Sequence, residues 1–231
     1  PRPTPPAMIE FTDVTHAYGD RVVLREVSLT LSENRIGIVG ANGSGKSTLA
    51  RMINALVVPD SGTVIVDGLS VAKNKREVRR RVGFIFSDPD RQIIMPTVRE
   101  DIELSLRRTD LDKSARAERA GEVLARFGLA DHADHPAQRL SGGQKQLLAL
   151  ASVFVTDPAI IVADEPTTLL DLRNTRMLTD VFATLDEQLV VVSHDLDILA
   201  DFDRVIVIDE GRVVVDDEPR PALAAYRGMM S

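Results

Sequence analysis

The stretch from Gly40 to Thr48 carries the residue types that hold a chain of phosphates. It reads Gly-Ala-Asn-Gly-Ser-Gly-Lys-Ser-Thr and fits the pattern G-x-x-x-x-G-K-[ST] in full. Glycines let backbone N–H groups converge on phosphate oxygens, and the helix start that follows adds partial positive charge. Lys46 would supply a point charge for the β- and γ-phosphates, and the Ser47 hydroxyl would bind Mg²⁺. The other expected nucleotide-binding positions of this phosphate loop are Asn42, Gly43, Ser44, Gly45 and Thr48.

Two carboxylates follow an apolar run at residues 160–163. A buried parallel strand places its last residues at the carboxyl edge of the sheet, where ligands bind. Asp164 would then hold Mg²⁺ through water, and Glu165 would polarise the attacking water as a general base. A second apolar run, at residues 189–193, leads to His194, which could hydrogen-bond a γ-phosphate or orient water. A purely structural histidine is the alternative.

Residues 140–144 read Leu-Ser-Gly-Gly-Gln and stand at a predicted helix start. Ser141 is a good N-cap, and Gly142 and Gly143 leave N–H groups open to an anion. Taken alone, this segment is only a capped helix. Its position in the chain, between a phosphate loop and an acidic strand end, makes the segment a far more specific signal than its own sequence does.

The elements that must position these residues can be read from polarity patterns and turn residues. Alternating runs predict two strands joined by a turn at Gly19-Asp20. Between residues 88 and 136, charged helix-forming sequence predicts a helical insert, with Val123, Leu124, Phe127 and Leu129 at helical spacing. We expect strands at 9–14, 21–31, 35–39, 63–66, 82–86, 160–163, 189–193, 205–209 and 212–215, and helices at 46–56 and 141–155.

Composition and charge exclude several classes of protein. The 231 residues, 44% of them hydrophobic, are enough for a large folded domain, which excludes a disordered chain. A net charge of -7 argues against a general nucleic-acid binder, so we expect no nucleic-acid partner. The lack of cysteine excludes disulfides and thiol catalysis. No apolar run reaches about 18 residues, and the proline-rich start lacks a signal-peptide core, so a cytosolic protein is expected.

From Ile9 to Val215, the order of the motifs resembles the ATP-binding subunit of ABC transporters. The matching positions are Tyr18, the phosphate loop, the signature segment at residues 140–144, Asp164 with Glu165, Asp171 and His194. The resemblance implies an α/β fold with a P-loop NTPase (RecA-like) core, an N-terminal antiparallel β subdomain and an inserted α-helical subdomain. It also implies one ATPase domain over residues 8–231, with the helical subdomain at 88–157 and a flexible tail at 1–7. ATP and Mg²⁺ are the implied cofactors, and ATP hydrolysis is the implied activity.

In that family two such domains pair head to tail, and each ATP lies between the phosphate loop of one domain and the signature segment of the other. By this resemblance Ser141, Gly142 and Gly143 contact the γ-phosphate of the partner's ATP. Tyr18 corresponds to the aromatic that stacks on adenine, although a hairpin aromatic is the plainer interpretation. Asp171 matches a loop that crosses the dimer interface. ATP would close the dimer, hydrolysis would open it, and a membrane partner would receive both movements.

One position departs from the family pattern. The family carries a glutamine at the end of the strand expected at residues 82–86, where this chain has Ser87. That glutamine reaches Mg²⁺ and the attacking water and couples the site to the membrane partner. Serine has a hydroxyl but a shorter reach. Three interpretations stay open: Ser87 binds the metal through an extra water, Asp88 substitutes, or coupling depends less on this group.

Residues 88–92, Asp-Pro-Asp-Arg-Gln, resemble a stretch of the energy-coupling-factor (ECF) ATPases, which drive uptake of vitamins and of nickel or cobalt ions. In them a second glutamine, here Gln92, lies in a short helix near the coupling surface, and the apolar residues 93–95 would contact a partner or belong to the core. The stretch after the last hairpin is short, as in biotin-type and some metal-ion systems, so biotin is the first substrate expected. The implied partners are a second ATPase subunit, identical or related, an integral membrane scaffold and a membrane substrate-binding protein, at the cytoplasmic face of the cell membrane.

Three other classes of protein contain some of these motifs and are alternative interpretations. A conventional ABC transporter subunit differs mainly around residues 87–92. A soluble ABC ATPase of translation or DNA repair usually carries two ATPase halves or a coiled-coil insert, and sedimentation with membranes or with ribosomes would separate it from a transporter subunit. A small-molecule kinase would use the phosphate loop but has no need of the signature segment.

Overall fold

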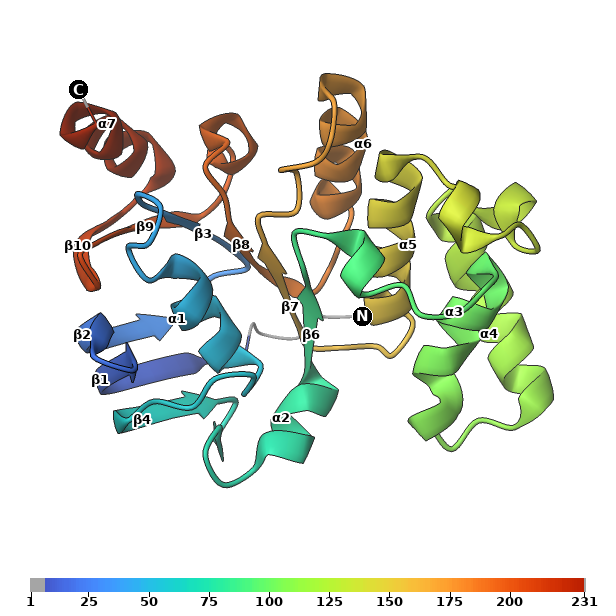
Figure 1. Ribbon diagram of the computed structural model, residues 1–231, viewed down its shortest axis with the longest axis horizontal. Coiled ribbons are helices and arrows are strands. Elements are labelled where there is room, and N and C mark those ends of the chain that lie inside the picture. Colours follow the sequence, from blue (N-terminus) through green and yellow to red (C-terminus); the bar gives the residue numbers. More distant parts are fainter. Residues whose placement is uncertain (1–6, 231) are drawn as a thin grey trace. The chain divides into compact units, whose positions relative to one another are not determined.

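The computed structural model describes residues 7–230, without the side chain of Arg108 (Figure 1). Contacts divide the chain into two compact units. The first comprises the described part of Pro1–Phe84, Ala159–Glu165 and the described part of Asp186–Ser231; the second comprises Ile85–Pro158 and Pro166–Leu185. The flexible tail expected at residues 1–7 falls, except for Ala7, outside the described residues, and the domain boundaries expected from the sequence stay predictions.

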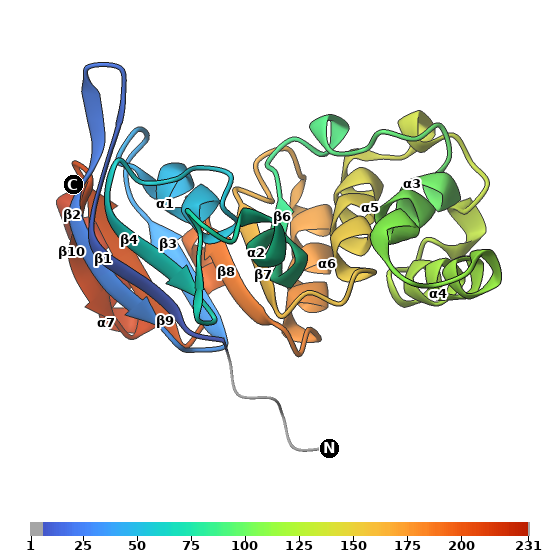
Figure 2. The same ribbon diagram turned by 90° about the horizontal axis from the view of Figure 1, so that it is seen from below.

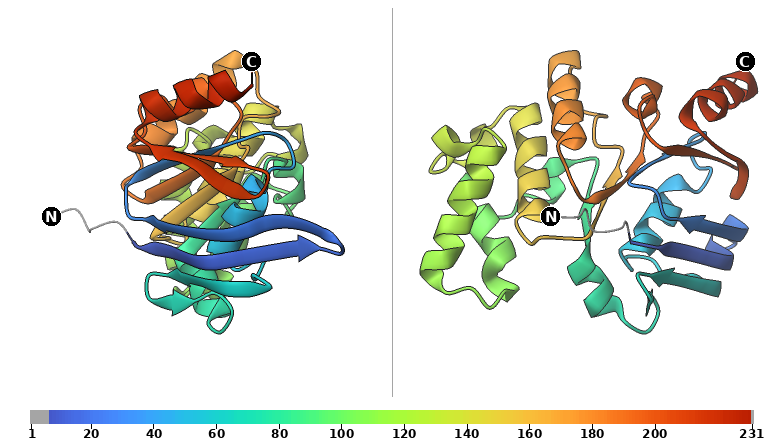
Figure 3. Two further views of the ribbon diagram at one scale, coloured as in Figure 1. Left: turned by 90° about the vertical axis from the view of Figure 1, so that its left-hand side faces the viewer. Right: turned by 180° about the vertical axis from the view of Figure 1, so that it is seen from behind.

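A four-stranded antiparallel sheet opens the first unit. β1 (Ile9–Tyr18) and β2 (Arg21–Leu31) form a hairpin, seen in blue in the left view of Figure 3, in which Tyr18 pairs with Arg21 across the expected turn. β4 (Ser61–Val66) pairs with the other side of β1, and β5 (Leu69–Ser70) forms the edge. Apolar side chains alternate along β1 and β2 and bury one face of the sheet.

A six-stranded sheet carries the chemistry-bearing strand ends. Its order is β10-β9-β3-β8-β7-β6. The strands are β3 (Arg35–Val39), β6 (Val82–Ile85), β7 (Ile160–Asp164), β8 (Gln188–Val192), β9 (Arg204–Asp209) and β10 (Arg212–Asp217). β3 runs parallel to β8 and β9, and β7 runs parallel to β8, whereas β10 closes the sheet as an antiparallel hairpin partner of β9. Every residue of β7 and β8 is buried, as expected for continuous apolar runs covered on both faces.

Parallel pairing aligns the carboxyl ends of three of these strands. Ile38 of β3 and Asp164 of β7 both lie opposite Val192 of β8. The phosphate loop, the two carboxylates and His194 therefore follow neighbouring strand ends at one edge of the sheet. α1 (Lys46–Ile53) starts at this edge and contacts β7 and β8 on one side and β2 and β4 on the other, so it packs between the two sheets (Figure 1).

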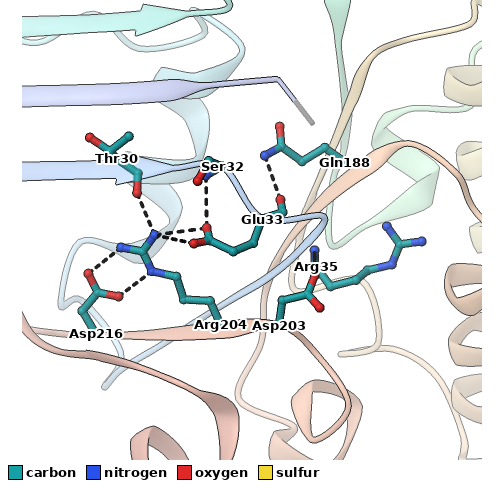
Figure 4. A network of polar contacts seen from close by, with 8 residues as sticks. All are labelled: Thr30, Ser32, Glu33, Arg35, Gln188, Asp203, Arg204 and Asp216. Atoms are coloured by element: carbon teal, nitrogen blue, oxygen red, sulfur yellow. Dashed lines mark hydrogen bonds and ion pairs between the residues drawn. The ribbon is translucent and has the colours of Figure 1, made fainter. Parts of the chain in front are cut away.

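A charged cluster around Arg204 joins the two sheets (Figure 4). On β9, the Arg204 guanidinium donates to both carboxylate oxygens of Asp216 on β10 at 2.6 Å. It also donates to the carbonyl of Thr30 on β2 at 2.7 Å and to Glu33 at 3.1 Å. The Asp216 hydrogen bond, supported by Glu33, raises the pKa of Arg204 above its ordinary value. Because its partners come from β2, β10 and the turn before β3, one side chain holds three segments together.

The second unit is helical and is built around α5 (Gly142–Phe154), shown in yellow in Figure 2. α5 contacts α3 (Val98–Ser105), α4 (Lys113–Arg126), α6 (Leu172–Ala183) and the 3-10 turn η1 (Pro89–Arg91). The further 3-10 turns are η2 (Leu106–Arg108), η3 (Ala130–His132) and η4 (Ala137–Arg139). The four apolar residues noted at helical spacing, Val123, Leu124, Phe127 and Leu129, are all buried. Within residues 7–230, no helix is long and apolar enough to cross a bilayer.

The strands expected from the sequence are confirmed: those at 21–31 and 35–39 have the expected bounds, and the others differ by one to four residues at an end. β1 runs on to Tyr18 rather than stopping at Val14, because β2 supplies hydrogen-bonding partners along the whole hairpin. The helix expected at 46–56 ends at Ile53, since Ala55 adopts a left-handed backbone with φ 55°.

Three helices were not expected: α2 (Lys75–Arg81), α6 and α7 (Pro219–Met229). α2 buries only Val78, and α6 buries only Leu178 and Phe182. α7 also buries few residues and packs on β9 and β10. Such narrow apolar stripes give little periodic signal in a sequence.

Candidate active site

The phosphate loop is shaped by glycines where it turns from β3 into α1. Gly45 is the N-cap of α1 and has φ 109°, which L side chains rarely adopt. A Cβ at this position would lie 2.5 Å from the carbonyl oxygen of Val23. The helix has no side-chain cap, so its first N–H groups stay open. This local geometry suits an anion at the helix N-terminus.

The Lys46 ammonium lies inside the curve of the loop. Its Nζ donates to the carbonyl oxygens of Gly40 at 2.7 Å and Ala41 at 2.9 Å. Burial lowers the pKa of Lys46, while the charges of Glu165 and Asp164 oppose that shift. A phosphate in the loop would offer this cation stronger acceptors than two neutral carbonyls.

Ser47 and Asp164 bring two oxygen ligands together from α1 and β7. The Ser47 hydroxyl donates to Asp164 Oδ1 at 2.7 Å, and the aspartate side chain is only 5% exposed. A hydroxyl beside a buried carboxylate is the hard-oxygen donor set that suits Mg²⁺, which takes few protein ligands when substrate phosphates complete its shell. Residues 7–230 hold no group of three or more His, Cys, Asp or Glu that could bind a metal ion.

Arg51 completes this cluster and was not among the residues predicted from the sequence. Its Nη2 lies 3.2 Å from Asp164 Oδ2, so the two carboxylate oxygens are shared between Ser47 and Arg51. Arg51 stands four residues after Ser47 on α1, on the same helix face. That spacing was the signal available in the sequence.

Glu165 leaves the strand in an unusual conformation. Its φ is 54°, in the left-handed region, and its N–H donates to the carbonyl of Val192 at 2.8 Å. Its Oε2 accepts hydrogen bonds from the backbone N–H of His194 at 3.2 Å and from His194 Nδ1 at 2.6 Å. Left-handed non-glycine residues cluster at functional sites. The two residues expected to act on the γ-phosphate and water are therefore in direct contact in the first unit.

Tyr18 lies at the end of the β1–β2 hairpin and is 51% exposed. Its ring meets that of His16 edge to face, with centroids 4.8 Å apart. Its exposed side chain is free to stack on a flat base. Its cross-strand partner in the hairpin, Arg21, donates through Nη2 to the carbonyl of Gly43 at 3.3 Å and so links the hairpin to the phosphate loop.

In the second unit, the signature segment forms the N-terminus of α5. Ser141 is the N-cap, and a capping box joins it to Gln144: Gln144 N–H donates to Ser141 Oγ at 3.3 Å, and Ser141 N–H donates to Gln144 Oε1 at 2.9 Å. Gly142 is exposed, so its backbone is open to a ligand. The expected N-cap at Ser141 is present, and of the two glycines expected to be open only Gly142 is exposed.

Gly143, in contrast, is buried against α6. A Cβ on Gly143 would overlap the side chain of Asn174. The backbone N–H of Asn174 donates to Asp171, the N-cap of α6, at 2.8 Å. Asn174 therefore joins the signature segment to Asp171, two regions that the sequence could only name separately.

Ser87 makes no side-chain hydrogen bond within the described part of the chain. The neighbouring Asp88 accepts from the N–H of Asp90 at 3.1 Å and pairs with Arg91 at 3.2 Å, so its carboxylate is engaged in its own turn. Gln92 follows the one-turn helix η1 rather than lying within it.

Residues 88–92 are held against α5 at two points. Gln92 Nε2 donates to the carbonyl of Ala149 at 3.1 Å, and Gln92 Oε1 accepts from the N–H of Phe86 at 3.2 Å. Lys145 Nζ lies 2.7 Å from Asp90. Of the adjoining apolar residues, Ile94 is 73% exposed. These contacts link residues 88–92 to the helix that begins with the signature segment.

Comparisons with known proteins agree with these features. Residues 24–168, more than half of the chain, match the family described as "ABC transporter". A protein of Deinococcus radiodurans that carries the general name of an ABC transporter ATP-binding protein is 50% identical, over 97% of this chain and 99% of its own length. The biotin transport ATP-binding protein BioM of Rhizobium etli is 45% identical, over 95% of this chain and 97% of its own.

Solved structures give the same assignment. CbiO1 of Clostridium perfringens, described as part of the ABC transporter complex CbiONQ, superposes with a TM-score of 0.85 at 27% identity, covering 96% of this chain and 92% of its own. A dimeric ATP-binding cassette solved with ADP and Pi gives a TM-score of 0.79 at 31% identity, covering 92% of this chain and 99% of its own. The chain therefore belongs to the ABC transporter ATP-binding family, whose members are ATPases with this P-loop fold.

Proposed function

We propose that this chain is the ATP-hydrolysing subunit of an energy-coupling-factor importer, with biotin as the first substrate to test and a cobalt or nickel ion or another vitamin as alternatives. The observation that carries the proposal is the 45% identity to a biotin transport ATP-binding protein along nearly the whole of both chains. The Asp88–Gln92 segment, which resembles that of ECF ATPases and is bonded to α5, supports it.

ATP would bind with its phosphates in the glycine-rich loop. Lys46 would exchange its two carbonyl partners for phosphate oxygens, and the open N–H groups of α1 would complete the cradle. Ser47 and Asp164 would hold Mg²⁺, which when bound neutralises charge on the phosphates. Tyr18 would stack on the adenine.

Hydrolysis would use Glu165 and His194. Glu165 takes a proton from the attacking water, while His194, now bonded to its Oε2, turns to the γ-phosphate. In a head-to-tail dimer, Ser141, Gly142 and Gly143 of the partner subunit contact the same γ-phosphate. The dimer closes on ATP because ATP binds the closed state better, and it opens when the γ-phosphate leaves. The cassette solved as a dimer with ADP and Pi supports such a cycle.

The partners would be a second ATPase subunit, an integral membrane scaffold and a membrane substrate-binding protein. The chain would be peripheral, at the cytoplasmic face of the membrane. Ser87 would act on the metal through a water or take no part in binding it, since its hydroxyl is short and the Asp88 carboxylate is already engaged.

Purification from native membranes tests this proposal. The tagged chain, solubilised in mild detergent, is expected to bring with it a membrane scaffold and a small membrane protein whose bound ligand names the substrate. A transmembrane channel in two copies, without a small substrate-binding protein, would favour a conventional ABC transporter. Ribosomes or nucleic acid alone would contradict a transport function.

A further inference from the structure

A row of hydrogen bonds leads from the signature segment to two histidines. Ser141 N–H donates to Gln144 Oε1 at 2.9 Å, and Gln144 Nε2 lies 2.9 Å from His132 Nε2. His132 Nδ1 in turn lies 3.0 Å from His135 Nδ1, and the two rings meet at 63°. All four residues belong to the second unit. His132 ends η3, so the row links this turn to the first turn of α5.

The chemistry of each partner determines where the protons are. Since Gln144 Oε1 accepts from a backbone N–H, the other end of the amide must be the NH₂ group. An NH₂ group can only donate, so His132 Nε2 must be an unprotonated acceptor. Neutral His132 then carries its proton on Nδ1 and donates it to His135 Nδ1, which is unprotonated. Of the two neutral forms of His132, only this one satisfies both of its contacts.

We propose that His132 is a positioning residue for the signature segment. Its Nε2 holds the Gln144 amide in the orientation that caps Ser141, and His135 selects the required tautomer. The inference rests on the proposed role of Ser141, Gly142 and Gly143 in binding the partner subunit's ATP. If His132 loses its acceptor, Gln144 is free to rotate away, and the Ser141 backbone is no longer held in the conformation that presents the two glycines.

The test uses the full chain with Glu165→Gln, a background in which ATP is expected to accumulate the closed dimer. His132→Leu removes the acceptor while keeping an apolar side chain of similar length. His132→Gln is the conservative variant, because its amide oxygen reaches about as far as Nε2. Asp131→Asn, an exposed neighbour on η3, is the matched control. Light scattering measures ATP-driven dimerisation, and a fluorescent ATP analogue measures nucleotide binding by the monomer.

His132→Leu is expected to weaken dimerisation about 5-fold per site, and so about 25-fold for two sites, the effect of losing one ordinary hydrogen bond at each. Nucleotide binding by the monomer should change less than about 2-fold, because the monomer uses its own phosphate loop. His132→Gln should restore most of the loss, and Asp131→Asn should have no effect. A loss of global stability alone would lower both readouts together.

Two results would overturn the inference. The first is that the His132→Leu variant dimerises normally with ATP although the Ser141→Ala variant does not. The second is an NMR spectrum of ¹⁵N-labelled histidine in which the neutral His132 imidazole carries its proton on Nε2. If the Glu165→Gln background itself fails to dimerise with ATP, the proposed function is at fault. The role of His132 is then tested by two other measurements. NMR should show its neutral imidazole protonated at Nδ1, and His132→Leu should accelerate hydrogen exchange at the Ser141 amide.

Discussion

At the scale of single residues, Glu165 combines a left-handed backbone with a carboxylate that is already hydrogen-bonded. Both contacts, to the N–H and to the Nδ1 of His194, involve the same oxygen, Oε2. The second oxygen is therefore the one available to a water molecule. The backbone N–H of Glu165, whose φ is 54°, donates to the carbonyl of Val192 at 2.8 Å, which helps hold the left-handed conformation.

Replacing Glu165 by Gln should slow ATP hydrolysis about 100- to 10,000-fold, because the amide cannot accept the proton of the attacking water. ATP binding should stay roughly unchanged, since the phosphate loop is intact. Steady-state phosphate release and nucleotide binding together measure the two effects. Glu218→Gln, at an exposed position before α7, serves as control. Hydrolysis at the normal rate would exclude Glu165 as the base.

Gly143 shows why a glycine is needed at the second signature position. Gly143→Ala would force its methyl group into the side chain of Asn174. We expect the variant to lose ATP-driven dimerisation and about 1–3 kcal/mol of stability, as overpacked sites do. The double variant with Asn174→Ala should recover part of the lost stability, because the colliding Oδ1 and Cγ atoms are removed and only the Asn174 Cβ, at 2.8 Å, stays close to the new methyl group. Thermal unfolding of the two variants and of Asn174→Ala alone would show this. If Gly143→Ala were destabilised as much with Asn174→Ala as without it, the proposed overlap between the new methyl group and the Asn174 side chain would be contradicted.

At the scale of elements, the Arg204 cluster adds side-chain bonds to the β9–β10 pair and links that pair to β2 and the turn before β3. Its guanidinium meets Asp216 with two bonds and also reaches Thr30 and Glu33 (Figure 4). The side chain is 19% exposed, so solvent screening is partial. Through this side chain β9 and β10 also contact β2 in the other sheet.

Arg204→Met should lower the free energy of unfolding by about 2 kcal/mol, because it removes charge-assisted bonds and leaves Glu33 and Asp216 without their cation. A raised pKa means that the folded state favours the charged guanidinium, so this stabilisation is fully present below the ordinary arginine pKa and is lost only as pH rises above it. The difference between variant and parent should thus persist from about pH 6 to 9. Urea unfolding at several pH values measures it, with exposed Arg220→Met as control. No difference at any of these pH values would show that the cluster is not stabilising.

At the scale of the whole molecule, nucleotide binding and folding are linked. The phosphate loop, Asp164 and His194 come from three separate parts of the chain, and all of them belong to the first unit. A ligand that binds only the folded arrangement must stabilise it.

ATP with Mg²⁺ at about 100 times its Kd should raise the unfolding free energy by about 2.7 kcal/mol. Lys46→Ala should remove most of this gain, because the loop then lacks its cation. Differential scanning fluorimetry over a range of ATP concentrations checks both statements, and Lys73→Ala, an exposed lysine outside the site, is the control. A gain that survives in Lys46→Ala would place the nucleotide elsewhere.

The sequence by itself determined the family and the order of the strands along the chain, and it predicted the residues that bind phosphate or metal. It could do so because these features depend on local patterns: glycine spacing in the phosphate loop, apolar runs before Asp164 and His194, and a cap at Ser141. The helical insert was visible for the same reason, through the apolar spacing around Val123 and Leu124.

Only the tertiary structure decided which side chains meet. The Arg51–Asp164 pair, the overlap between Gly143 and Asn174, and the link from Gln144 to His132 join residues whose distance depends on packing. α2, α6 and α7 were also missed, since each buries too few side chains to leave a periodic pattern. Hydrogen bonds between distant segments leave no such signal either, because many residue pairs in a chain could form them and the fold brings only a few together.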